Sequence, residues 1–149
     1  MQVNFRVNEY PRYASAIRDA ELRHRIPSDL LALLLWQSSR YIKETIEGTK
    51  QHSRHGAVGI AMLTPDEAAD MNIPIDSRTN PALVIERCAL RLATLHRECG
   101  TWQRAALAHK FGKSLMLSIS SGARAMPDHA AESFSQINSL LSFREQIAA

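Results

Sequence analysis

The segment LLALLLWQSSRY, residues 30–41, is apolar almost all round as far as Trp36. Such a segment is typical of a helix that is buried on several sides. Ser28-Asp29 precedes it and suits the N-cap of a helix. The sequence therefore predicts a central helix from Leu30 to about Tyr41.

An amphipathic helix is predicted just upstream of this central one. Pro11 suits its first turn, and Ile26-Pro27 ends it. The helical spacing predicts an apolar side made by Ala14, Ile17, Ala20 and Leu22.

Loops and helix starts alternate downstream. Residues 48–53 and the small, glycine-containing segment 56–61 predict loops, the second with a backbone that approaches another group closely. Thr64-Pro65 predicts a short helix ending near Asn72, and Asn80-Pro81 predicts a long one closed by Gly100. The apolar face of the long helix is expected to carry Ile85, Cys88, Leu92, Leu95 and Cys99.

The C-terminal third contains two further predicted helices. One covers Trp102–Phe111 and ends at Gly112. A serine-rich stretch, 114–122, has no clear period, and Met126-Pro127-Asp128 then opens a last helix. Its apolar side would hold Phe134, Ile137, Leu140 and Leu141. Since no repeat or linker is visible, residues 1–149 are predicted to form a single domain.

The composition narrows the function classes. Of 149 residues, 45% are hydrophobic and 22% charged, which indicates a globular protein. The net charge of +3 lacks the aromatic interleaving of a nucleic-acid footprint, so no nucleic-acid partner is expected. No apolar run approaches the ~20 residues of a membrane span, and Met1–Val7 does not begin a secretory signal peptide. We expect a chain made in the cytoplasm without a signal peptide.

The two cysteines are predicted to be reduced. Cys88 and Cys99 lie eleven residues apart on one predicted helix, about 16 Å at its helical rise, beyond the reach of a disulfide. Cys88 falls on the apolar face and is predicted to be a core residue. Because no C-x-x-C spacing is present, neither a metal nor a cofactor is expected.

Three motifs resemble the soluble lytic transglycosylase (SLT) family of the lysozyme-like superfamily, in its order W-Q-E-S-x-[FY], S-x-x-G-A-x-G-[LI]-[MA]-Q-x-x-P-x-x-A and W-x-x-A-L-A-A-Y-N-A-G. Here they read WQSSRY (36–41), SRHGAVGIAMLTPDEA (53–68) and WQRAALAHKFG (102–112). The resemblance covers about residues 17–112, and the C-terminal segment 114–149 lies outside it. It implies a mainly α, lysozyme-like fold.

The resemblance also implies that the catalytic acid is missing. In the family the glutamate of W-Q-E-S protonates the glycosidic oxygen of peptidoglycan, and the muramyl 6-hydroxyl closes a 1,6-anhydro ring. The matching residue here is Ser38, whose hydroxyl is far too weak an acid for that step. By resemblance, the substrate-binding cleft positions are Ser38, Ser39, Gly59, Met62, His109 and Lys110; Val84 and Cys88 replace two further family residues.

Two other carboxylates are candidates to replace the missing acid. Glu44 and Glu47 follow Ser38 by six and nine residues, which on a continued helix places them about 120° and 180° around the axis, away from a cleft. If they belong to a loop instead, either can turn toward it. Trp36 and Trp102 are interpreted as core residues, with stacking on sugar rings as the alternative.

These observations lead to three hypotheses. The first is a catalytically degenerate lytic-transglycosylase-like protein that serves as a structural bacteriophage virion component, in a tail or ejection apparatus. The loop Ile46-x-Gly48 ahead of Gly56-Ala57 resembles the phage-borne branch of the family. Its partners would be other virion subunits, in a homo- or hetero-oligomer, with residual peptidoglycan contact. The second is an active transglycosylase with a relocated carboxylate, and the third is a free glycan-binding module.

Overall fold

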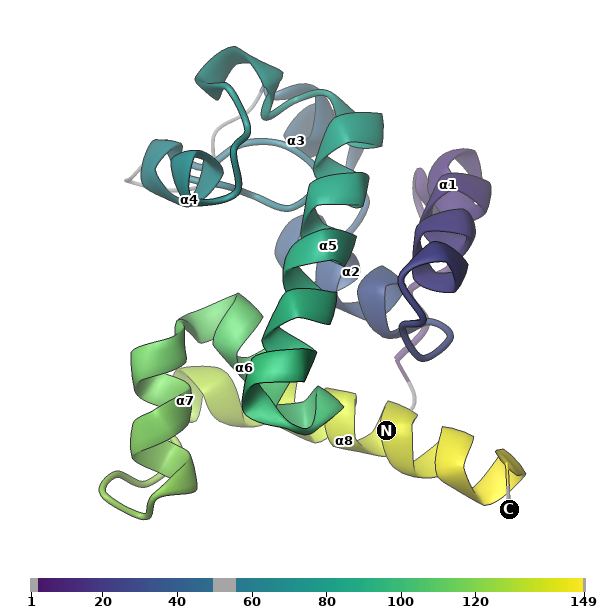
Figure 1. Ribbon diagram of the computed structural model, residues 1–149. Helices are drawn as coiled ribbons and strands as arrows, with labels where there is room; N and C mark the ends of the chain where they lie inside the picture. Colours follow the sequence, from purple (N-terminus) through teal and green to yellow (C-terminus); the bar gives the residue numbers. More distant parts are fainter. Residues whose placement is uncertain (1–2, 50–55, 149) are drawn as a thin grey trace. The chain divides into compact units, whose positions relative to one another are not determined.

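The computed structural model describes residues 3–49 and 56–148, with side chains as far as residue 142. Within these ranges the chain is mainly helical, and the single β feature is an isolated antiparallel bridge between Val58 and Leu63. The helices, labelled in Figure 1, are α1 (Tyr10–Arg23), α2 (Leu30–Ser39), α3 (Lys43–Glu47), α4 (Pro65–Asp70), the 3-10 helix η1 (Ile75–Ser77), α5 (Pro81–Cys99), α6 (Trp102–Phe111), α7 (Lys113–Ser120) and α8 (Asp128–Ala148). None of the helices in the described ranges combines the length and apolarity that a bilayer crossing requires.

The described chain divides into two compact units, and the boundary falls inside α5. One unit consists of Asn4–Leu90. Its core is centred on α2, where every residue of Leu30–Leu35 is buried, and α1 packs against it. This confirms the prediction of a central apolar helix.

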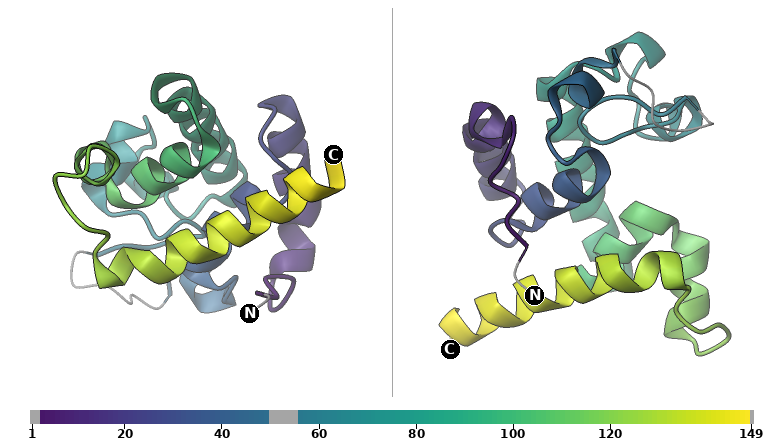
Figure 2. Two further views of the ribbon diagram at one scale, coloured as in Figure 1. Left: turned by 90° about the horizontal axis from the view of Figure 1, so that it is seen from below. Right: turned by 180° about the vertical axis from the view of Figure 1, so that it is seen from behind.

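The other unit holds Val3 and residues 91–148. Here α6 contacts both α7 and α8, and the two views of Figure 2 draw α8 as a long helix beside α6. The buried side chains of this unit include Leu92, Ala105–Ala108, Met116, Ile137 and Leu141.

Most helix boundaries follow the predicted signals. Thr64 and Glu67 form a capping box at α4, and the Asn80 side chain accepts a hydrogen bond from the Leu83 N–H at the start of α5. On α5 the predicted stripe is buried from Ile85 to Leu95, and Cys99 is half-buried. Both cysteines are reduced thiols, and Cys88 is a fully buried core residue as predicted.

One expectation about the elements was wrong. Leu22 is 60% exposed, because the buried side of α1 is made by Tyr10, Ile17, Ala20 and Glu21. The helices α3 and α7 were not predicted, and α4 ends at Asp70, close to its predicted end near Asn72. The helix α7 packs against α6, and within it Leu115 is half-buried and Met116 is buried. Residues 50–53 of the predicted loop lie outside the described residues.

Candidate functional site

The C-terminal turn of α2 carries Ser38 and Ser39. The Ser38 hydroxyl donates to the Leu34 carbonyl at 3.2 Å, and the Ser39 hydroxyl donates to the Leu35 carbonyl at 3.1 Å. Each serine therefore bonds back to the preceding helical turn, a common arrangement for this residue type within helices. Ser39 is buried, whereas Ser38 is half-buried.

Two consecutive residues in the left-handed region turn the chain after α2. Arg40 and Tyr41 both have φ of 55°, a conformation that is unfavourable for side chains of this size. The N-terminal arm, residues 4–9, compensates: the Asn8 side-chain amide donates to the Arg40 carbonyl and the Glu9 N–H to the Tyr41 carbonyl, both at 2.9 Å. The buried Tyr41 hydroxyl donates to the Ala32 carbonyl at 2.6 Å. The turn is thus held from both sides.

Neither tryptophan is a fully buried core residue. Trp36 is half-buried, and the guanidinium carbon of Arg40 lies 3.7 Å from its ring centroid. Trp102 is half-buried and stacks on His96, with ring centroids 3.8 Å apart and planes 3° from parallel. The interpretation of both as core residues was therefore too strong.

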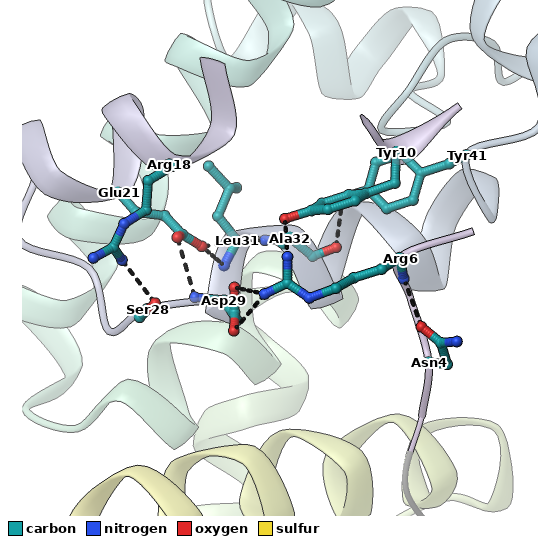
Figure 3. Close-up of polar contacts among 10 residues, drawn as sticks. All are labelled: Asn4, Arg6, Tyr10, Arg18, Glu21, Ser28, Asp29, Leu31, Ala32 and Tyr41. Carbon is teal, nitrogen blue, oxygen red and sulfur yellow. Dashed lines mark hydrogen bonds and ion pairs between the residues drawn. The ribbon is translucent and has the colours of Figure 1, made fainter. Parts of the chain in front are cut away.

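The N-terminus of α2 is capped by a residue that the sequence analysis missed. Asp29 occupies the N-cap position, but its φ is 74° and its side chain accepts no capping bond. Instead Glu21, on α1, accepts hydrogen bonds from the N–H groups of Asp29 (3.1 Å), Leu31 (3.0 Å) and Ala32 (3.3 Å), as Figure 3 shows in part. The predicted N-cap position is thus confirmed at Asp29, but a buried carboxylate from another helix supplies the capping hydrogen bonds.

Burial sets the ionisation of this region. Desolvation raises the pKa of Glu21 to about 7, against the lowering effect of the three backbone donors. Burial likewise raises the pKa values of Tyr10 and Tyr41. Glu21 lies on the helical stripe of Tyr10, Ala14 and Ile17, so an acid at a core position was the available signal.

A tight loop holds Gly59 and Met62. The backbones of Val58 and Leu63 exchange two hydrogen bonds, and the Met62 N–H donates to the Gly59 carbonyl at 3.0 Å. Gly59 has φ of 94°, and a Cβ there would lie 2.0 Å from the Arg78 carbonyl oxygen. The close backbone approach predicted for this segment is confirmed, and its partner is the Arg78 backbone.

The remaining cleft positions, His109 and Lys110, lie on α6 in the other unit. Both are half-buried, and the Nδ1 atom of His109 is buried and finds no hydrogen-bond partner among the described residues. Desolvation, reinforced by the positive charges of Arg91 and Lys110, lowers the pKa of His109 to about 3. The imidazole is therefore neutral at physiological pH.

The two carboxylates considered as replacements for the missing acid lie on α3. Glu44 and Glu47 are both exposed, whereas Thr45 and Ile46 between them are buried. Since α3 begins at Lys43, after the turn at Arg40 and Tyr41, it is a separate helix and not a continuation of α2. In the described part of the chain, no three His, Cys, Asp or Glu side chains gather as a metal site would require.

The comparisons give one match. A family model described as the transglycosylase SLT domain matches residues 15–128, which is most of the chain. No curated protein and no solved structure gave a significant match. The matched range includes α2, the loop that holds Gly59 and Met62, and α6, so it spans all six cleft positions predicted from the sequence.

Proposed function

Because the chain belongs to the transglycosylase SLT domain family, with its mainly helical lysozyme-like fold, we propose that it is a catalytically degenerate member that contacts peptidoglycan without cleaving it. The observation that supports this proposal most is Ser38, the residue that the motif resemblance aligns with the catalytic glutamate of the family. The Ser38 hydroxyl donates to the Leu34 carbonyl within α2.

The chemistry of the reaction explains why this position matters. Cleavage of a glycosidic bond requires a carboxylic acid with a raised pKa to protonate the leaving oxygen. A serine hydroxyl does not ionise near neutral pH, so no general-acid step can be written through Ser38.

The other replaced positions support the same proposal. Val84 and Cys88, which stand where the family has asparagine and glycine, are fully buried on α5. Met62 replaces a glutamine, and the neutral His109 imidazole replaces a tyrosine. Apolar or unpaired groups thus stand where a glycan-cleaving site needs hydrogen-bonding side chains.

We further propose that the domain is a structural virion component of a bacteriophage tail or ejection apparatus. The support is the likeness of the loop at Ile46 and Gly48 to the phage-borne branch, together with Leu117 of α7, which is 55% exposed and available for a neighbouring subunit. Other virion subunits would be its partners. Mass spectrometry of purified particles tests this role, and finding the chain only in the infected-cell lysate would contradict it.

The proposal that the chain does not cleave peptidoglycan is tested on purified sacculi. The full chain is incubated with sacculi, and soluble products are analysed for 1,6-anhydro muropeptides, with an active SLT enzyme as positive control. We expect no product, and we expect the chain to sediment with the sacculi. Release of the anhydro product would overturn the proposal.

The same assay evaluates the alternative function, an enzyme with a relocated carboxylate. If product forms, the variants Glu44→Gln and Glu47→Gln identify the acid, because both carboxyls are exposed and their substitution leaves the core intact. Glu21→Gln serves as a comparison, since both oxygens of that carboxylate already accept backbone hydrogen bonds.

A further inference from the structure

A polar hollow of about 320 Å³ lies beside the N-terminus of α2, within the unit Asn4–Leu90. Its volume is at the lower end of the range for small-molecule sites, roughly 300–1,000 Å³. It is formed by the N-terminal arm, α1 and the loop before α2, and most of its polar groups are drawn in Figure 3. The lining residues are Arg6, Tyr10, Ala14, Ser15, Arg18, Glu21, Ser28 and Asp29.

The two acids of the hollow are already compensated. Glu21 is only 1% exposed, and three backbone N–H groups at the start of α2 donate to its oxygens. Asp29 pairs with Arg6, whose Nη2 donates to both carboxylate oxygens at 3.2 and 3.3 Å. The guanidinium of Arg18, by contrast, has no acidic partner among the described residues and donates to the Ser28 hydroxyl at 2.7 Å. Arg6 and Asp29 offset each other, and burial raises the pKa of Glu21 to about 7, so below that pH the charge that is left in the hollow is the positive charge of Arg18.

The hollow contains unused hydrogen-bond donors on Arg18 and Tyr10. Arg18 carries five N–H donors, and only the Ser28 bond uses one of them within the described chain. The Tyr10 side chain is buried, and its hydroxyl accepts from Arg6 at 3.2 Å. No described residue accepts the Tyr10 hydroxyl proton, although buried hydroxyls normally find an acceptor. The hydroxyls of Ser15 and Ser28 line the same space.

We propose that this hollow binds an oxyanion, a carboxylate or phosphate group, through the Arg18 guanidinium and the Tyr10 hydroxyl. A planar guanidinium donates to two oxygens of such a group at once, and the hydroxyl supplies a third donor. Because all of the groups belong to one unit and none lies at a cleft position, the site is independent of glycan binding at Ser38.

The test uses the ¹⁵N-labelled full chain and two probes, sodium acetate and sodium phosphate, titrated at constant ionic strength and followed by amide chemical shifts. We expect saturable shifts confined to residues 10–18 and 28–32. The probe that binds more tightly in the two titrations shows whether the site prefers a carboxylate or a phosphate group.

Three variants locate the site. Arg18→Gln should weaken binding of the preferred probe at least tenfold, and Tyr10→Phe about threefold or more. Arg12→Gln is the matched control, because Arg12 lies on the same helix, is exposed and does not line the hollow. It should bind within twofold of the unchanged protein. Thermal unfolding of each variant verifies its fold.

Two outcomes would overturn the proposal. One is the absence of saturable shifts with either probe. The other is an equal loss of binding in Arg18→Gln and Arg12→Gln, which would indicate attraction by net charge alone. If Tyr10→Phe unfolds, the comparison of the two arginine variants still decides the result.

Discussion

At the scale of single residues, Glu21 links folding to pH. Its pKa rises from 4.5 to about 7 on folding, so between these values the folded state holds a proton that the unfolded state has lost. Stability therefore falls as pH increases through this window, by an amount on the order of 3 kcal/mol. Glu21→Gln does not titrate and should lack this slope. Urea unfolding at pH 5, 6, 7 and 8 measures it.

The matched control for this prediction is Glu47→Gln, which removes an exposed carboxylate. The control should keep the pH dependence of the unchanged protein. The Glu21→Gln variant should also be less stable at pH 5, because a carboxamide has one acceptor oxygen where the start of α2 presents donors to two. Parallel pH profiles for Glu21→Gln and the unchanged protein would show that burial does not shift this group.

His109 gives a residue-scale prediction of opposite sign. Its pKa falls from 6.5 to about 3 on folding, so the unfolded state binds the extra proton and stability decreases as pH falls through this window. In the folded protein the imidazole ¹⁵N shifts of His109 should stay constant from pH 8 to 5. In urea the same histidine should titrate near 6.5. A titration midpoint near 6 in the folded chain would contradict the burial of Nδ1.

At the scale of the element, α4 shows how far local signals determine a helix. The Glu67 N–H donates to the Thr64 hydroxyl at 3.2 Å, and the Thr64 N–H donates to the Glu67 carboxylate at 3.0 Å. Thr64→Ala removes the first bond and should destabilise the protein by about 1 kcal/mol. Thr64→Ser keeps the hydroxyl, so its free energy of unfolding should stay within about 0.3 kcal/mol of that of the unchanged chain. Amide exchange at Glu67 should likewise be faster in Thr64→Ala and nearly unchanged in Thr64→Ser.

The difference between local and long-range contacts explains which elements the sequence could predict. Capping residues and apolar spacing are local, so α4, α5 and α6 were placed within a few residues of their observed bounds. The cap of α2 depends on Glu21, which lies a helix away in the chain, and no local rule selects it over Asp29. Position 38 was predicted from its motif, whereas the proposed oxyanion site combines residues of three segments that no motif joins.

At the scale of the whole molecule, the two compact units share one helix. The boundary falls between Leu90 and Arg91, and α5 runs through it without a break from Pro81 to Cys99. A continuous helix propagates order along its length, because each residue added to it gains one hydrogen bond. We therefore expect weakening of α5 at the boundary to affect both units.

Leu90→Gly tests this expectation. Leu90 is 41% exposed, so truncation removes little packing, and glycine is about 1 kcal/mol less favourable than alanine within a helix. Relative to the matched control Leu90→Ala, the melting temperature should fall by roughly 2–4 °C. Amide exchange should accelerate in α2 of one unit and in α6 of the other, since both depend on the same helix. Acceleration restricted to one unit would mean that the units unfold independently and that α5 does not transmit cooperativity across the boundary.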